Sequence, residues 1–153
     1  ATTTVQDLRG VYMVSATQGW AVGSGGVILY WNGTAWSLYT SPTTAQLNSI
    51  SMMDTNNDGA ADAGFAAGNG GVVLRFTGSA WTSSSLGTMN FRGVDMYSPN
   101  DAWAVGTDGA AWHWDGSTWT SFSSGTTVQL NGISLIRSGT YPNPTSGWRQ
   151  IFK

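Results

Sequence analysis

A short phrase recurs along this chain, and it limits the possible folds more than any other feature. Each copy begins with a small apolar run that ends in glycine, and a hairpin dipeptide and a tryptophan follow further along. The complete copies begin at residues 19–23, 64–68 and 102–106. A period of about 40 residues, made of short apolar segments and glycine turns, is typical of proteins that repeat one small β-unit.

Four strands can be predicted within each copy. The first strand of each unit alternates in polarity and covers residues 8–13, 47–52, 91–96 and 130–135. The recurring apolar run is the second strand, a run such as 27–31 is the third, and the fourth opens at Trp36, Trp81 or Trp119. The dipeptides between third and fourth strands are Asn32-Gly33, Thr77-Gly78 and Asp115-Gly116. They predict tight hairpins because glycine adopts positive φ without a Cβ clash.

These features predict an all-β fold, a β-propeller whose blades are four-stranded antiparallel sheets with the first strand innermost. The predicted units are 1–46 for blade 1 with a preceding strand, 47–89 for blade 2, 90–129 for blade 3 and 130–153 for half of blade 4. The spacing from Trp20 to Trp103 equals that from Phe65 to Trp148, which places Trp148 in the second strand of the last unit. The sequence therefore encodes about three and a half blades, with its recurring tryptophans predicted to pack between them.

An arc of three and a half blades would leave apolar blade faces and a sheet edge in water. Three arrangements would avoid this exposure: a compact four-bladed ring, a ring completed by another copy or a partner chain, or continuation in a longer polypeptide. We favour the last two, because a four-bladed ring needs a severe twist and its last blade would still lack two strands. A homo-oligomer, or an assembly with other protein chains, is therefore expected.

The composition points to an environment outside the cell. The 153 residues include one histidine and no cysteine, and the net charge is −2. The few basic residues are scattered, which argues against binding to nucleic acid or to an anionic membrane surface. Only 9% of the residues are charged, so the polar surface must come from Ser, Thr, Asn and Gly, as is common in extracellular β proteins. With no membrane-spanning apolar run, we predict a secreted or cell-surface protein without membrane insertion.

The second unit has a longer connection, residues 54–62, between its first two strands. Oxygen-bearing side chains occupy its positions 1, 3, 5 and 9, namely Asp54, Asn56, Asp58 and Asp62. Gly59 permits a sharp turn, and the carbonyl of Ala60 offers a main-chain oxygen. Because Ca²⁺ takes six to eight oxygen ligands, this segment predicts a structural calcium site. Phe65 stands where an EF-hand needs a glutamate, and the alternative interpretation is a solvated turn rich in Asn and Asp.

Two family resemblances accompany these motifs. Residues 54–62 match the Asp-x-Asn/Asp-x-Asp-Gly-x-x-Asp loop of FG-GAP repeats, the integrin-type propeller, which implies calcium binding between the first two strands of a blade. The other units resemble the Trp-Ala-Val-Gly … Asp-Gly-x-x-Trp blades of secreted bacterial propellers related to photosystem-II-assembly-factor-like and sialidase-like repeats. As an alternative for the end of the chain, residues 141–147 are similar to the opening of type IX secretion sorting domains. Either interpretation of the end implies export.

Candidate ligand contacts are repeat positions whose residue type changes from unit to unit. One such position lies on the third strand and holds Tyr30, Arg75 and His113. Another lies on the first strand and holds Arg9, Asn48, Arg92 and Asn131. If the latter residues approach the central channel, their donors could hold carboxylates, sulfates or sugar hydroxyls. Solvation of the channel mouth, or pairing with neighbouring aspartates, would produce the same pattern.

The side chains give little support for catalysis. His113 is the only imidazole, no glutamate is present, and no nucleophile elbow can be recognised. The sequence therefore predicts an extracellular, non-catalytic interaction or assembly module, adhesin-like or scaffold-like and stabilised by calcium. A lectin-like propeller that binds glycans through Tyr30, Arg75 and His113 is the alternative, and a glycan-processing enzyme ranks third.

Overall fold

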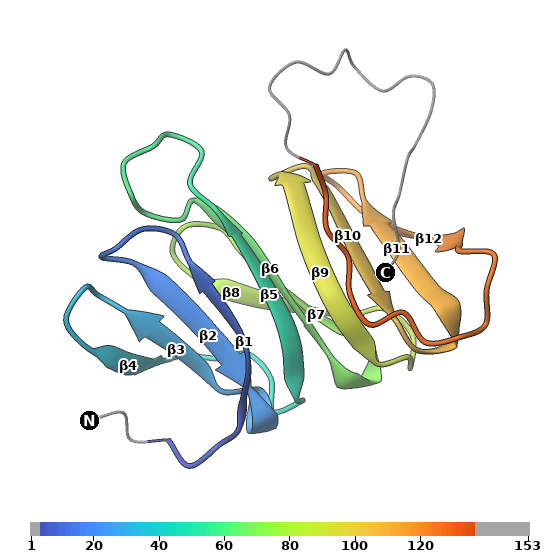
Figure 1. The fold of residues 1–153 in the computed structure, drawn as a ribbon, viewed down its shortest axis with the longest axis horizontal. Helices are drawn as coiled ribbons and strands as arrows, with labels where there is room; N and C mark the ends of the chain where they lie inside the picture. Colours follow the sequence, from blue (N-terminus) through green and yellow to red (C-terminus); the bar gives the residue numbers. More distant parts are fainter. Residues whose placement is uncertain (1–3, 137–153) are drawn as a thin grey trace.

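The computed structural model describes residues 4–136, in which twelve strands form three separate four-stranded antiparallel sheets (Figure 1). Sheet 1 contains β1 (Leu8–Met13), β2 (Gly19–Gly23), β3 (Ile28–Trp31) and β4 (Trp36–Tyr39). Sheet 2 contains β5 (Leu47–Met53), β6 (Ala63–Gly68), β7 (Val72–Phe76) and β8 (Trp81–Ser85). Sheet 3 contains β9 (Phe91–Ser98), β10 (Asp101–Gly106), β11 (Ala110–Trp114) and β12 (Trp119–Ser123). The prediction of an all-β chain built from four-stranded units is confirmed.

Within each sheet the strands pair in chain order, as expected for a meander joined by short hairpins. The predicted turns between third and fourth strands have glycine at positive φ, with values of 92° at Gly33, 86° at Gly78 and 97° at Gly116. In the third turn Asp115 Oδ1 accepts hydrogen bonds from the backbone N–H groups of Ser117 and Thr118, both at 2.8 Å. The N–H of Thr118, then that of Ser117, lower the pKa of Asp115 to about 2.

The first strands lie side by side, and side-chain hydrogen bonds join them. β5 contacts both β1 and β9, which confirms that the first strand of each unit is innermost. Ser51 Oγ donates to Asp95 Oδ1 at 2.9 Å, and Asn48 Nδ2 donates to the carbonyl of Phe91 at 2.7 Å. Because neighbouring sheets are not paired by a backbone ladder, these side-chain bonds help set their register.

The core consists of two apolar clusters, one at each junction between sheets. At the first junction Trp20 is surrounded by rings from both sheets, with centroids 4.9 Å away at Tyr39, 5.0 Å at Phe76 and 5.7 Å at Trp81. At the second junction Phe65 takes the place of Trp20 and lies 5.2 Å from Trp119. The prediction that recurring aromatic residues pack between units is confirmed for Trp81 and Trp119, whereas Trp36 lies on the outward side of sheet 1.

Residues 130–136 run beside β9 in Figure 1, where the first strand of a fourth unit was predicted. The N–H of Leu135 donates to Asp95 Oδ2 at 2.7 Å, and a Cβ on Gly93 would lie 3.0 Å from the Cα of Gly132. The segment is not a β-strand, however, because within the described part it has no partner strand. The predicted second strand with Trp148, and the sorting-domain interpretation of residues 141–147, lie outside the described residues. No helix in residues 4–136 is long and apolar enough to cross a membrane.

Candidate functional site

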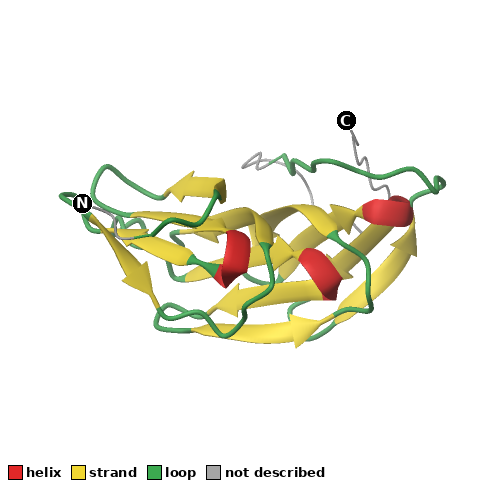
Figure 2. Cartoon of the chain, turned by 90° about the horizontal axis from the view of Figure 1, so that it is seen from below, coloured by secondary structure: helices red, strands yellow, loops and turns green. Residues whose placement is uncertain are grey.

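The two ends of the sheets carry different kinds of loop. At one end, short 3-10 helices connect the second and third strands: η1 (Ser24–Gly26), η2 (Asn69–Gly71) and η3 (Thr107–Gly109). Figure 2 views the molecule from this end and shows all three helices. Residues 54–62 lie at the opposite end, where Figure 1 shows them as a wide loop between β5 and β6. A ligand site at one end would therefore be spatially separate from a site at the other.

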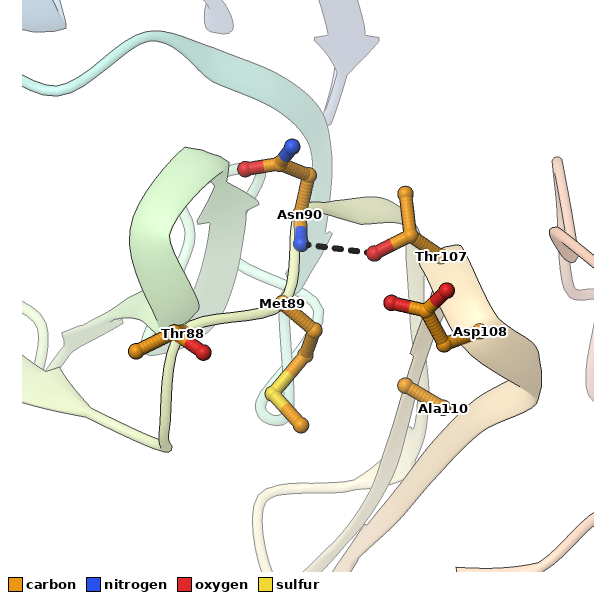
Figure 3. A pocket seen from close by; sticks show the side chains of 6 residues that line it. All are labelled: Thr88, Met89, Asn90, Thr107, Asp108 and Ala110. Atoms are coloured by element: carbon orange, nitrogen blue, oxygen red, sulfur yellow. Dashed lines mark hydrogen bonds between the residues drawn. The ribbon is translucent and has the colours of Figure 1, made fainter. Parts of the chain in front are cut away.

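A shallow pocket of about 430 Å³ lies at the end that carries the 3-10 helices, between sheets 2 and 3 (Figure 3). Its lining comes from the linker after β8 and from η3 with the start of β11: Thr88, Met89, Asn90, Thr107, Asp108 and Ala110. The backbone N–H of Asn90 donates to Thr107 Oγ1 at 3.1 Å, and Asn90 Oδ1 accepts from the N–H of Gly70 at 3.0 Å. Asn90 thus ties the linker to both η2 and η3 and fixes one wall of the pocket.

Asp108 is the charged residue of this pocket, and its backbone is unusual. It has φ 58° and ψ 27°, in the left-handed region, where the equivalent residues of the other sheets are Gly25 at φ 65° and Gly70 at φ 68°. A left-handed conformation is unfavourable for an L-residue by about 1–2 kcal/mol, although aspartate tolerates it better than most. Sheet 3 therefore holds an exposed carboxylate where sheets 1 and 2 have glycine.

The repeat pattern of the sequence does not reveal this pocket. The available signal was the triplet Thr107-Asp108-Gly109, which differs from Ser24-Gly25-Gly26 and Asn69-Gly70-Gly71 by a charge at the middle position. The charge of Asp108 indicates a binding site only once the structure places Met89 and Asn90 beside it. The linker that carries these two residues is not part of the repeated phrase, so its position could not be predicted from the repeat.

The predicted calcium loop is well ordered by hydrogen bonds of its own. Asp54 Oδ1 accepts from the N–H of Asn57 at 2.7 Å, and Asp54 Oδ2 accepts from that of Gly59 at 2.8 Å. Asn57 and Gly59 have φ values of 61° and 87°, which gives the sharp turn expected at this point. Asp58 Oδ1 accepts from the N–H of Ala60 at 2.8 Å. The loop is also attached to sheet 1, because Ser15 Oγ donates to the carbonyl of Gly59 at 2.9 Å.

The donor set of this loop suits calcium in chemical type, since it consists of carboxylate, amide and carbonyl oxygens. The three carboxylates do not converge, however: no cluster of three or more acidic or histidine side chains occurs in residues 4–136. Asp62 instead accepts from the Thr55 hydroxyl at 2.6 Å and from the Thr55 N–H at 2.8 Å. The hydroxyl bond, and then the backbone bond, lower the pKa of Asp62, which favours the ionised form of its carboxylate.

Tyr30 and Arg75 lie on the side of their sheet that faces the next sheet, and His113 lies on the equivalent side of sheet 3. Tyr30 is half-buried, with its ring 4.9 Å from that of Trp20. The guanidinium carbon of Arg75 lies 5.0 Å from the ring centre of Trp114 in sheet 3, a cation–π contact. His113 Nε2 lies 2.9 Å from Asp101 Oδ1, and its ring is 4.6 Å from that of Trp103. Tyr30 and Arg75 therefore contribute to the packing between sheets.

The variable residues of the first strands divide into two groups. Asn48 donates to Phe91 of the next sheet and, at 2.9 Å, to Asn69 Oδ1 of its own sheet, so it helps to hold the two sheets together. Arg9 is exposed, and Arg92 is half-buried with its Nε buried and unpartnered among the described residues. Both arginines stay candidate ligand contacts, although the structure does not bring either of them into the pocket beside Asp108.

Comparison with known proteins rests on the fold. The sequence matches no protein-family model and no curated protein. A solved structure described as YCF48 bound to D1 peptide has a TM-score of 0.67 and 18% identity, over 82% of this chain and 44% of that chain. YCF48 from Cyanidioschyzon merolae has a TM-score of 0.63 and 20% identity, over 78% and 40%. Both are β-propeller proteins. The three sheets form an arc of a β-propeller. This arc spans less than half the length of either neighbour.

Proposed function

We propose that this chain is a non-catalytic protein-interaction module that holds a segment of another protein in the pocket between sheets 2 and 3. The observation that carries the proposal is Asp108, a carboxylate placed at a repeat position that is otherwise glycine, beside the thioether of Met89. Backbone strain retained at a surface position is more common at binding sites than elsewhere. The solved propeller of similar fold that carries a bound peptide supports the same class of function.

The chemistry of the pocket indicates the kind of segment that would fit. Asp108 offers an anionic oxygen to a lysine, an arginine or a free amino terminus. Met89 offers a polarisable apolar surface that adapts to irregular partners. Thr88 is exposed beside them and adds a hydroxyl that can donate or accept. The preferred ligand is therefore an extended peptide with a basic side chain next to an apolar one.

Selection from a random peptide library on the immobilised chain tests this proposal. We expect the selected peptides to be rich in lysine or arginine and to bind the Asp108→Gly variant at least about tenfold more weakly, as for loss of one charged contact. This variant restores the residue of sheets 1 and 2, so its fold is preserved. Asp58→Asn, which removes a charge at the opposite end, is the matched control. Selected peptides without basic residues, or equal binding to Asp108→Gly, would refute the proposal.

The lectin and enzyme alternatives gain no specific support from the structure. Tyr30 and Arg75 pack against tryptophans of the arc, so they do not form an exposed aromatic platform for sugars. His113 is hydrogen-bonded to Asp101 within sheet 3, and the pocket beside Asp108 contains no histidine. We therefore propose protein binding ahead of either alternative.

We further propose that calcium binds residues 54–62 and that the protein works outside the cell, where free calcium is in the millimolar range that such modules need. Asp54, Asn56, Asp58 and Asp62 would provide side-chain oxygens and Ala60 a carbonyl. Calcium would supply positive charge that relieves repulsion between the carboxylates. The contact from Ser15 to Gly59 would transmit this stabilisation to the junction between sheets 1 and 2.

Thermal unfolding with and without calcium tests this second proposal. At ten times a dissociation constant of about 10⁻³ M, binding to the native state alone stabilises it by about 1.4 kcal/mol. We therefore expect about 10 mM calcium to raise the Tm by a few degrees, and magnesium at the same concentration to raise it much less. The Asp54→Asn variant should lose the effect, while Asp108→Gly should keep it. An unchanged Tm of the parent chain would rule out the calcium site.

A further inference from the structure

The turn between β3 and β4 of sheet 1 contains a motif that lies outside both the pocket and the loop at residues 54–62. It reads Asn32-Gly33-Thr34, the Asn-x-Ser/Thr sequence that accepts N-linked glycans. One other asparagine of the chain has a hydroxyl residue two positions later, in Asn143-Pro144-Thr145, but proline at the middle position excludes modification. Asn32 is therefore the one asparagine of this sequence that meets the requirement.

The turn holds the carboxamide of Asn32 in one orientation. Asn32 Oδ1 accepts hydrogen bonds from the backbone N–H of Thr34 at 3.0 Å, from the hydroxyl of Thr34 at 2.9 Å and from the N–H of Ala35 at 2.9 Å. Because a backbone N–H only donates, the atom at this position must be the oxygen. Asn32 Nδ2, the atom that would receive a sugar, makes no hydrogen bond among the described residues, and the Asn32 and Thr34 side chains are both exposed.

Sheet 3 shows that this turn needs only an acceptor oxygen. Asp115 stands there in place of Asn32, and its Oδ1 accepts from the N–H and the hydroxyl of Ser117 and from the N–H of Thr118, each at 2.8 Å. A carboxylate has no amide nitrogen, yet the same three bonds form. Asn32 Nδ2 is therefore not needed for the turn. N-glycosylation keeps the amide C=O, so it would leave the three bonds to Asn32 Oδ1 in place.

We propose that Asn32 is an acceptor site for an N-linked glycan. The co-reactant is an oligosaccharide carried on a lipid diphosphate. Asn32 Nδ2 bonds to the anomeric carbon of this donor, the bond from that carbon to the diphosphate oxygen breaks, and the lipid diphosphate leaves while Nδ2 loses one proton to solvent. This inference goes beyond the proposed peptide binding and rests on the proposed location outside the cell, because N-linked glycans mark surface loops of exported proteins.

The position of the turn fits a bulky modification. β3 begins at η1 and runs away from it, so the turn lies at the end of sheet 1 opposite the pocket, at the outer edge of the arc (Figure 1). β4 is the last strand of this sheet and pairs only with β3, and its Leu38 is 58% exposed. An open strand edge is a template for pairing with another chain. A glycan beside β4 would obstruct such pairing without reaching the pocket.

Secretion of residues 1–153 from a cell that adds N-glycans tests this inference. A signal peptide directs the chain to export, so the outcome does not depend on where the natural protein works. We expect a mass above that of the polypeptide, which peptide N-glycosidase should reduce while it converts Asn32 to aspartate. Asn32→Asp should abolish the modification and keep the fold, because Asp115 supports the same turn. Thr34→Ser keeps the hydroxyl, so it should retain the glycan, whereas Thr34→Ala should lose it.

A secreted parent chain with only the mass of the polypeptide would overturn the proposal. So would a modification that persists in Asn32→Asp, because the sugar would then be attached to another residue. The glycosylated chain and Asn32→Asp should bind the selected peptides equally, since the turn and the pocket lie at opposite ends. Loss of peptide binding by both chains would contradict the pocket function and leave the assignment of Asn32 unaffected.

Discussion

The Trp20→Ala variant should be strongly destabilised, with a loss of about 3–5 kcal/mol in the free energy of unfolding. Trp20 is 2% exposed and its ring lies within 6 Å of rings from both sheet 1 and sheet 2. The alanine would leave a cavity at the junction, because the two sheets are fixed by their innermost strands and cannot close over it. Domains of this size have a free energy of unfolding of about 5–15 kcal/mol, so this substitution would remove a large part of it.

Trp20→Phe is the informative control for this prediction. Phe65 occupies the same position in sheet 2, so the repeat already accepts a phenylalanine at a junction. Trp20 Nε1 is buried with no hydrogen-bond partner among the described residues. Trp20→Phe therefore breaks none of the described hydrogen bonds and removes a buried unpaired donor, which is favourable. Urea denaturation followed by tryptophan fluorescence should show a small change for phenylalanine and a large one for alanine. Equal losses for both variants would mean that the indole shape, and not apolar volume, determines the packing.

The fold was predictable from the sequence because one physical pattern occurs several times. Each unit has apolar alternation in its first strand, a glycine-terminated second strand and a hairpin dipeptide. Because equivalent segments of a repeat fold alike, a strand assigned in one copy supports the same assignment in the other copies. Residues 130–135 show where this reasoning fails. Their alternation matches that of the other first strands, but a strand requires a hydrogen-bonded partner, and residues 4–136 contain none for this segment.

The candidate sites were less predictable, because their properties depend on contacts between units. Tyr30 and Arg75 vary between repeats as ligand contacts do, yet the face of the sheet that carries each of them is covered by the next sheet. Asp108 was not among the residues singled out from the sequence, because its proximity to Met89 does not follow from the repeat. The loop at residues 54–62 was recognisable because its ligand spacing is local, although its attachment to Ser15 was not.

Gly71 and Gly70 should differ sharply in their tolerance of alanine, although they are neighbours in η2. Both have positive φ, 74° and 68°, so either substitution carries the left-handed penalty of about 1–2 kcal/mol. A Cβ on Gly71 would also lie 2.3 Å from the carbonyl oxygen of Gly87, whereas a Cβ on Gly70 meets nothing within 4 Å. The N–H of Gly71 donates to the Met89 carbonyl at 2.6 Å, and its own carbonyl accepts from Leu86 at 2.8 Å. The linker therefore cannot move away without breaking these bonds.

We expect Gly71→Ala to lower the free energy of unfolding by at least about 3 kcal/mol, the sum of the conformational penalty and of overpacking against backbone. Gly70→Ala should lower it by about 1 kcal/mol, and Gly70→Asp by no more, because sheet 3 folds with Asp108 at that position. Because the linker that Gly71 holds also forms a wall of the pocket, partial unfolding of Gly71→Ala should abolish peptide binding before the sheets melt. Chemical denaturation and peptide titration of the three variants would measure both effects. Comparable stability of Gly71→Ala and Gly70→Ala would contradict the idea that close backbone contact, and not φ alone, requires glycine at the second position.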